Sequence, residues 1–172
     1  SVYAKSLWRE GKISSLQLLG ILVILARYKL GLVQLEKVMA DWIERSAGES
    51  EQEAVERCSL LAERHVLPTI FDAARFCIEK HRADGDVVAI LSASSSYIIH
   101  PVAESLQIEH VLATPLHVEK GRFTGGFDEP VCYGAGKVVW AERFCAERGL
   151  SVAESFFYTD SFINFFSFYL SQ

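Results

Sequence analysis

Three polar side chains stand at positions where phosphate chemistry could occur. Ser92 follows the apolar run at residues 87–91, Lys137 opens a helical pattern, and Asp160 follows a second apolar run at residues 156–159. Polar residues at the carboxyl ends of parallel strands are where open α/β sheets bind their ligands. A hydroxyl that donates to a phosphate oxygen, an ammonium that neutralises charge and a carboxylate that binds Mg²⁺ together suit phosphoryl transfer.

The first of these residues belongs to the stretch at residues 86–97, DVVAILSASSSY, around which the chain is organised. A β-branched apolar run that ends in small polar residues is typical of a buried parallel strand followed by a turn. The turn places backbone N–H groups and hydroxyls of Ser92, Ala93 and Ser94 before a helix start, where an anion is favoured. Each feature also has a purely structural alternative. The stretch can be a plain strand followed by a serine-rich turn. Lys137 can be a solvated lysine at a helix start, and Asp160 can be an N-cap or turn residue.

After Pro68 the pattern alternates between helix and strand, which predicts a layered, parallel α/β unit. Glycines at 121, 125 and 126 favour a hairpin turned away from the sheet, and Gly149 favours the end of the last helix. The predicted elements are helix 70–82, strand 87–91, a helix ending at 106, strand 110–113, hairpin 118–127, helix 137–148 and a buried strand at 155–159.

Before Pro68 the chain predicts helices joined by short connections, whose large apolar faces must pack on one another. These helices are expected over residues 2–10, 16–30, 32–45 and about 50–65, the last with a capping box formed by Ser50 and Glu53. We therefore predict an N-terminal helical-bundle cap at residues 1–68 and a Rossmann-like parallel sheet core at residues 69–172. The aromatic segment 162–172 receives no structural interpretation, although such a patch would favour association if exposed.

Composition excludes several functional classes. The net charge of −5 and the absence of a long basic run argue against binding to nucleic acid.

The four cysteines show neither a CxxC pair nor zinc-ligand spacing, which predicts reduced thiols in a cytoplasmic protein. The most apolar window, 16–30, is too short for a membrane span and favours a buried helix. The GAGK sequence ending at Lys137 is not a phosphate loop, since no Ser or Thr follows the lysine and Val131 replaces the required glycine.

Order and spacing of these stretches resemble the haloacid dehalogenase-like hydrolases, and within them the phosphoserine phosphatase-like group. The series VAILSAS at 88–94, CYGAGK at 132–137 and FFYTDS at 156–161 resembles motifs two, three and four of that family. The stretches YAKSLWREGKIS at 3–14 and VLATPLHVEKGRFTGGF at 111–127 are also similar to members of the group.

The resemblance implies a Rossmann-like core with a helical cap and Mg²⁺-dependent hydrolysis of a phosphomonoester through an aspartyl-phosphate intermediate. It implies that Ser92 and Lys137 are catalytic and hold the phosphoryl group with Ala93 and Ser94, and that Asp160 binds the metal. Where the family has a second motif-four acid the chain has Asn164, a neutral ligand that should weaken metal binding.

The family's first motif, DxDxT, which supplies the nucleophile, does not occur in the sequence. We therefore expect the chain to be a fragment, with an incomplete core and no turnover of its own. Two alternatives remain: an inactive module that only mediates binding or association, and a membrane-embedded hairpin over residues 16–43. Partners are expected to be small phosphorylated metabolites, with phosphoserine, histidinol phosphate and glycerol phosphates all open, and the oligomeric state is open too.

Overall fold

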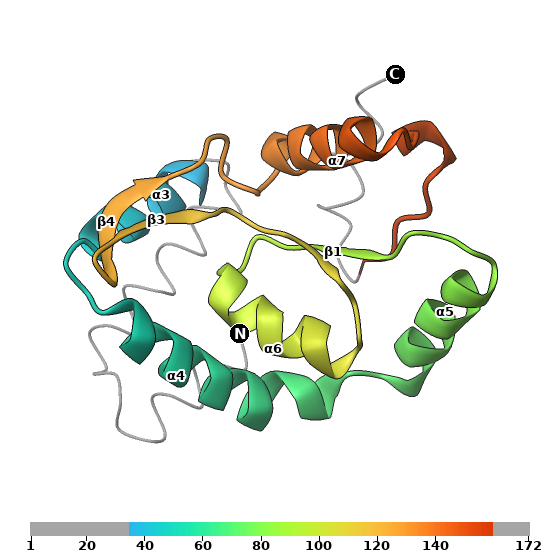
Figure 1. Ribbon diagram of the computed structural model, residues 1–172, viewed down its shortest axis with the longest axis horizontal. Helices are drawn as coiled ribbons and strands as arrows, with labels where there is room; N and C mark the ends of the chain where they lie inside the picture. The colour runs from blue at the N-terminus through green and yellow to red at the C-terminus, as the bar shows by residue number, and fades with distance from the viewer. Residues whose placement is uncertain (1–34, 160–172) are drawn as a thin grey trace. The chain divides into compact units, whose positions relative to one another are not determined.

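The computed structural model of the chain describes residues 35–159 (Figure 1). The helices predicted at 2–10 and 16–30, the predicted metal ligands Asp160 and Asn164, and the aromatic segment 162–172 lie outside this range. A boundary between two compact units falls between Met39 and Ala40, within the helix at Leu35–Arg45, and every later element belongs to the second unit. The cap and core boundary at residue 68 remains a prediction.

The helical part of the described chain contains two α-helices and two short turns of other helix types. Helix α4 begins as predicted, because the Ser50 side chain accepts a hydrogen bond from the Glu53 backbone N–H. Beyond Leu61 the chain continues helically up to the region of Pro68, where the helix was expected to end. The elements are α3 (Leu35–Arg45), α4 (Glu51–Leu61), the π-helical turn η1 (Ala62–Val66) and the 3₁₀ turn η2 (Leu67–Thr69).

The α/β part has the predicted parallel pair of strands joined by a helix. Strand β1 pairs with β2 in parallel, with Ala89 opposite His110, and α6 packs against both β2 and α4 (Figure 1). Strand β1 is two residues shorter than predicted, and Val87 is exposed because it precedes the ladder. The elements are α5 (Asp72–Ala83), β1 (Ala89–Leu91), α6 (Ser96–Ser105) and β2 (His110–Leu112). The α/β fold class is confirmed.

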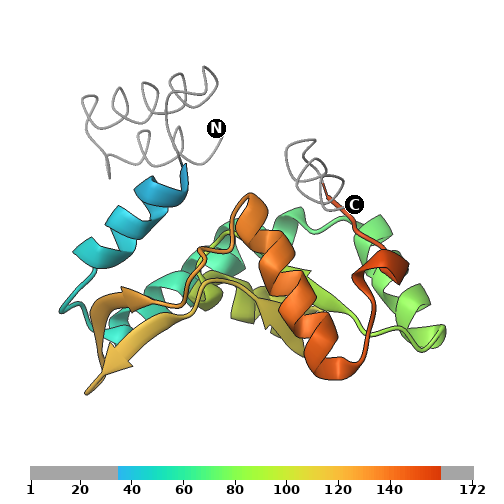
Figure 2. The ribbon, with the colours of Figure 1, turned by 90° about the horizontal axis from the view of Figure 1, so that it is seen from above.

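The predicted hairpin forms a two-stranded antiparallel sheet separate from β1 and β2 (Figure 2). Strand β3 (Leu116–Glu119) and strand β4 (Arg122–Phe127) are joined by Lys120 and Gly121, both at positive φ. Two successive residues at positive φ form the tight turn whose twist matches that of paired strands.

After the hairpin, helix α7 (Ala135–Arg148) ends at Gly149 in the left-handed conformation, as predicted, and a 3₁₀ turn η3 (Val152–Glu154) follows. The prediction of a buried strand at 155–159 is wrong. Phe156 is 72% exposed and Tyr158 is 65% exposed, and the segment forms no strand. Its aromatic rings lie beside His81 of α5 instead of entering a sheet, because apolar character alone does not provide a strand with a ladder partner.

All four cysteines are free thiols, as the sequence predicted. None of the helices within residues 35–159 is both long enough and apolar enough to cross a membrane.

Candidate phosphate-binding site

Ser92 lies immediately beyond the carboxyl end of β1. Its backbone N–H donates to the Leu112 carbonyl oxygen at 2.8 Å, so the parallel ladder extends one residue past the strand. The Ser92 Oγ accepts a hydrogen bond from the Ser94 N–H at 3.1 Å, which folds residues 92–94 into a tight turn. Ser92 and Ala93 are half-buried and Ser94 is exposed. The turn therefore faces solvent while remaining anchored to both strands.

Lys137 lies in the first turn of α7 and is only 6% exposed. The chain passes very close to itself where this helix begins. A Cβ placed on Gly136 would lie 2.0 Å from the Val131 carbonyl oxygen, so no residue larger than glycine fits. Close packing at this point sets the direction of α7 and, with it, the position of the lysine.

Cys132 joins the two regions. Its thiol is fully buried, and its Sγ donates to the Leu112 carbonyl oxygen at 3.6 Å. Burial raises the pKa of the Cys132 thiol to about 11, while the Lys137 ammonium and the Ser92 backbone have smaller, opposite effects. The Leu112 carbonyl oxygen accepts from both the Ser92 N–H and the Cys132 thiol, so Ser92 lies beside Cys132, which precedes Lys137 by five residues.

Thr114 supports this arrangement and was missed by sequence reasoning. Its buried Oγ1 accepts a hydrogen bond from the Cys132 N–H at 2.8 Å. The signal was available, since Thr114 is a polar residue just beyond the carboxyl end of a parallel strand, as Ser92 is. No comparable signal marked Cys132, which behaves in sequence as a small apolar residue.

The metal-binding part of the predicted site is not described by the structure. Asp160 and Asn164 both lie beyond residue 159, and residues 35–159 contain no group of three or more His, Cys, Asp or Glu side chains suited to hold a metal ion. The sequence has one Asp-x-Asp pattern, Asp84 and Asp86, and it lies in the turn before β1. Asp86 binds His81 at 2.7 Å, at the opposite end of the strand from Ser92.

These features form an environment suited to a phosphate group. The turn at residues 92–94 precedes the amino terminus of α6, where helix N–H groups favour negative charge. Lys137 brings a positive charge in a largely buried setting, where electrostatic interactions are stronger than in water. The carboxyl ends of parallel strands are where open α/β sheets bind anionic ligands.

Comparison with known proteins identifies the family. A family model described as haloacid dehalogenase-like hydrolase matches residues 2–162, so the chain belongs to the haloacid dehalogenase-like hydrolases. The resemblance inferred from the three motifs is thereby confirmed.

Two curated relatives are phosphatases by name. The chain is 34% identical over 96 residues to a probable phosphatase of Mycobacterium tuberculosis, an alignment that covers 56% of this chain and 33% of that protein. It is 25% identical over 138 residues to the histidinol-phosphatase of Neisseria meningitidis, covering 78% of this chain and 62% of that one. The chain thus spans about a third of the length of the mycobacterial relative.

Solved structures share the fold. A protein of unknown function from Bordetella pertussis Tohama I superposes with a TM-score of 0.71 at 23% identity, covering 88% of this chain and 69% of that chain. A phospho-aspartyl intermediate analogue of phosphoserine phosphatase superposes with a TM-score of 0.54 at 19% identity, covering 77% and 60% of the two chains. The likeness to the phosphoserine phosphatase group therefore holds at the level of the fold.

Proposed function

We propose that this chain forms the phosphate-binding part of a Mg²⁺-dependent phosphomonoester hydrolase. The observation that carries the proposal is the shared Leu112 carbonyl oxygen, which accepts from both the Ser92 N–H and the Cys132 thiol and so sets the turn after β1 beside the segment that leads into Lys137. A serine hydroxyl and a lysine ammonium at one end of a parallel sheet provide a hydrogen-bond donor and a charge for the same anion.

Each residue would have a distinct role toward the phosphoryl group. The Ser92 Oγ already accepts from the Ser94 N–H, so its own hydroxyl proton can be donated to a phosphate oxygen. The Ala93 N–H adds a second donor from the same turn. Lys137 would offset the negative charge that is spread over the phosphoryl oxygens in the transition state.

The metal ligands and the nucleophile complete the proposal. Asp160 would bind Mg²⁺, and Asn164 would add a neutral oxygen ligand; the bound metal would polarise a phosphoryl oxygen. The nucleophile in this family belongs to a DxDxT motif, and residues 1–172 contain none. Asp84 and Asp86 do not match this motif, since Val88 stands where it has Thr, and Asp86 lies before β1 whereas Ser92 lies after it. We infer that a polypeptide of these 172 residues alone binds phosphate without hydrolysing esters.

The substrate class follows from the chemistry of the turn and from the relatives. A phosphatase active on histidinol phosphate and a fold shared with phosphoserine phosphatase support a small phosphorylated metabolite. Phosphoserine, histidinol phosphate and glycerol phosphates are the candidates, with a cytoplasmic location in keeping with metabolites of this kind.

The proposal is tested by titrating the 172-residue chain with inorganic phosphate in a calorimeter. We expect Lys137→Met and Ser92→Ala each to weaken binding at least about tenfold, the effect of losing about 1.4 kcal/mol. Lys80→Met, at an exposed position on α5, is the matched control and should bind as the unmodified chain does. Equal binding by all four proteins would overturn the proposal.

A second assay addresses the nucleophile. The chain is incubated with p-nitrophenyl phosphate and Mg²⁺, and release of p-nitrophenol is followed. We expect no turnover above that of the Lys137→Met variant. Turnover that depends on Lys137 would show that a nucleophile is present in these residues and that the inferred inactivity is wrong.

Exposed aromatic side chains support a second candidate, a module for association with another protein surface. Phe71, Phe76 and Phe156 all expose most of their surface to solvent, and exposed aromatic surface is available for contact with another protein. Light scattering after gel filtration tests this candidate. The candidate is supported if the unmodified chain has a mass above that of a monomer and Phe76→Ser has the monomer mass of 19.3 kDa. If both proteins are monomers, self-association is contradicted.

A further inference from the structure

Tyr97 connects three elements that are far apart in the sequence. It lies in the first turn of α6, five residues beyond Ser92, and its hydroxyl donates to the Glu51 carboxylate at 2.8 Å. Its ring meets that of Phe123 in strand β4 edge to face, with centroids 5.4 Å apart. The start of α6 is therefore held to the start of α4 and to the hairpin.

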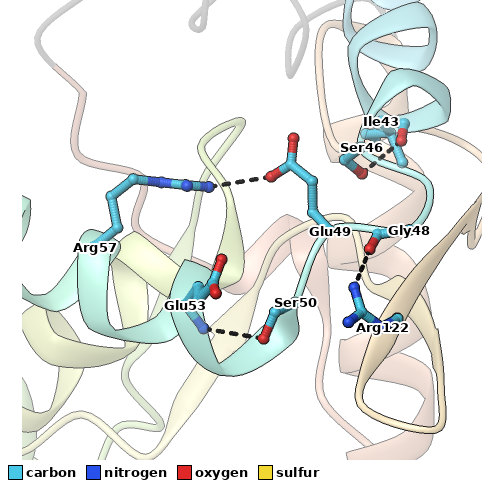
Figure 3. A network of polar contacts seen from close by, with 8 residues as sticks. All are labelled: Ile43, Ser46, Gly48, Glu49, Ser50, Glu53, Arg57 and Arg122. Atoms are coloured by element: carbon cyan, nitrogen blue, oxygen red, sulfur yellow. Dashed lines mark hydrogen bonds and ion pairs between the residues drawn. The ribbon is translucent and has the colours of Figure 1, made fainter.

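The surface that Tyr97 meets is itself well ordered by hydrogen bonds. The segment before α4 pairs with strand β4, through Gly48 N–H to the Phe123 carbonyl at 2.8 Å and Phe123 N–H to the Glu49 carbonyl at 3.1 Å. The Arg122 guanidinium donates to the Gly48 carbonyl at 2.6 Å, and Ser50 caps α4 (Figure 3). The Glu51 N–H donates to the Gly121 carbonyl, so the backbone that carries the acceptor of the Tyr97 hydroxyl is held to the hairpin.

On its other side Tyr97 is connected to the phosphate-binding turn. The Tyr97 N–H donates to the Ser95 Oγ, and the N–H groups of Ile98 and Ile99 donate to the Ser95 carbonyl. Ser95 directly follows the turn closed by the hydrogen bond from Ser94 to Ser92. A short, continuous set of hydrogen bonds and peptide bonds thus runs from Glu51 to Ser92.

The hydroxyl is a donor throughout the neutral range. Burial, followed by the hydrogen bond to Glu51 and the charge of that carboxylate, raises the pKa of Tyr97 to about 12. A protonated phenol facing a carboxylate forms a charge-assisted hydrogen bond, which is stronger than one between neutral groups.

We propose that Tyr97 is a positioning residue, whose hydrogen bond to Glu51 and contact with Phe123 hold the turn at residues 92–94 in the conformation that receives phosphate. The proposal deepens the function proposed above and depends on it for the identity of the ligand. Tyr97 acts through Ser92 and does not itself touch the phosphate. The residues that Tyr97 contacts, Glu51 and Phe123, lie on α4 and β4. The turn after β1 is therefore stabilised by elements outside the β1–β2 sheet.

Phosphate binding by Tyr97→Phe, Glu51→Leu and Glu51→Gln is the first test, measured by calorimetry on the 172-residue chain without magnesium. We expect about fivefold weaker binding in Tyr97→Phe and Glu51→Leu, within the usual range for two coupled sites. Glu51→Gln retains an acceptor oxygen and should restore nearly full affinity. Tyr158→Phe loses a similar hydrogen bond, to His81, and is the matched control with unchanged affinity. Equal affinity in Tyr97→Phe and the control contradicts the proposal.

Amide hydrogen exchange in the absence of phosphate is the second test, and it does not depend on the ligand. In Tyr97→Phe and Glu51→Leu, the amides of Ser94, Ile98 and Ile99 should exchange faster than in the unmodified chain, while the amides of α7 should exchange at the same rate. In Glu51→Gln, all of these amides should exchange nearly as they do in the unmodified chain. Unchanged exchange, or faster exchange throughout the molecule, overturns the positioning role. If exchange changes as expected but the unmodified chain binds no phosphate, the link between Tyr97 and the turn stands and the proposed function is wrong.

Discussion

The two ends of helix α7 lie in very different surroundings. At the amino end, Gly136, Lys137 and Val138 are buried, and the backbone of Val131 lies so close that no Cβ fits on Gly136. Beyond the carboxyl end, Leu150 and the aromatic residues Phe156 and Tyr158 are exposed, and the chain is held beside α5 by side-chain contacts to His81. Close packing positions the candidate phosphate site, whereas a few surface contacts position the segment that leads toward Asp160.

The largest difference between the two ends should appear when the same substitution is made at each. Gly136→Ala places a methyl group 2.0 Å from the Val131 carbonyl oxygen, and we expect a loss of about 3 kcal/mol in the free energy of unfolding. Gly149→Ala meets no atom within 4 Å and only has to adopt positive φ, so about 1 kcal/mol is expected. Urea unfolding followed by circular dichroism measures both. Equal losses would show that packing at the amino end is not special.

A smaller loss is expected from Thr114→Val, which keeps the shape of the side chain and removes its hydroxyl. The Cys132 N–H would then be buried without its acceptor, at an expected cost of about 2 kcal/mol in the free energy of unfolding. Thr124→Val is the control, because the Thr124 hydroxyl is exposed. A Thr114→Val protein as stable as the control would mean that another acceptor replaces the hydroxyl.

At the carboxyl end, His81→Ala should cost about 1 kcal/mol and act locally. Its ring contacts Asp86 and Tyr158 through opposite nitrogens and is 16% exposed, whereas His117 pairs with Asp128 at 52% exposure. His117→Ala is therefore the matched control for a surface His–Asp pair. Limited proteolysis should cut the segment 152–159 faster in His81→Ala and leave α7 intact. Equal cleavage in both variants would contradict the assigned contacts.

A final prediction concerns the pH dependence of stability at the amino end. Burial raises the pKa of Cys132 from 9.0 to about 11, so the folded state favours the protonated thiol. Its contribution to stability is complete below pH 9 and decreases as the pH rises from 9 to 11. The urea midpoint should therefore fall more steeply over this range in the unmodified chain than in Cys132→Ala. Parallel pH profiles would show that the thiol ionises as easily in the folded protein as in the unfolded one.

Local patterns were sufficient for most elements. The Ser50 cap, the glycine at the end of α7 and the hairpin over residues 118–127 were predicted because each depends on a few neighbouring residues. The strand predicted at 155–159 was wrong because an apolar run does not reveal which partner it meets. Ser92 could be selected as a candidate because it follows a strand, and Lys137 because it lies at a helix start. These local patterns do not tell how far apart the two residues lie in the folded chain.

The sequence by itself determined the alternation of helices and strands, the family to which the chain belongs, and the residue types available for phosphate chemistry. Only the tertiary structure decided that Ser92 and Cys132 share the Leu112 carbonyl oxygen, that the Thr114 hydroxyl accepts from the Cys132 N–H, and that Tyr97 donates to Glu51. The physical reason is that caps, turns and periodicity arise from interactions within a few residues. Contacts such as Thr114 to Cys132, 18 positions apart, and Tyr97 to Glu51, 46 positions apart, depend on how whole elements pack, and packing is a property of the folded chain.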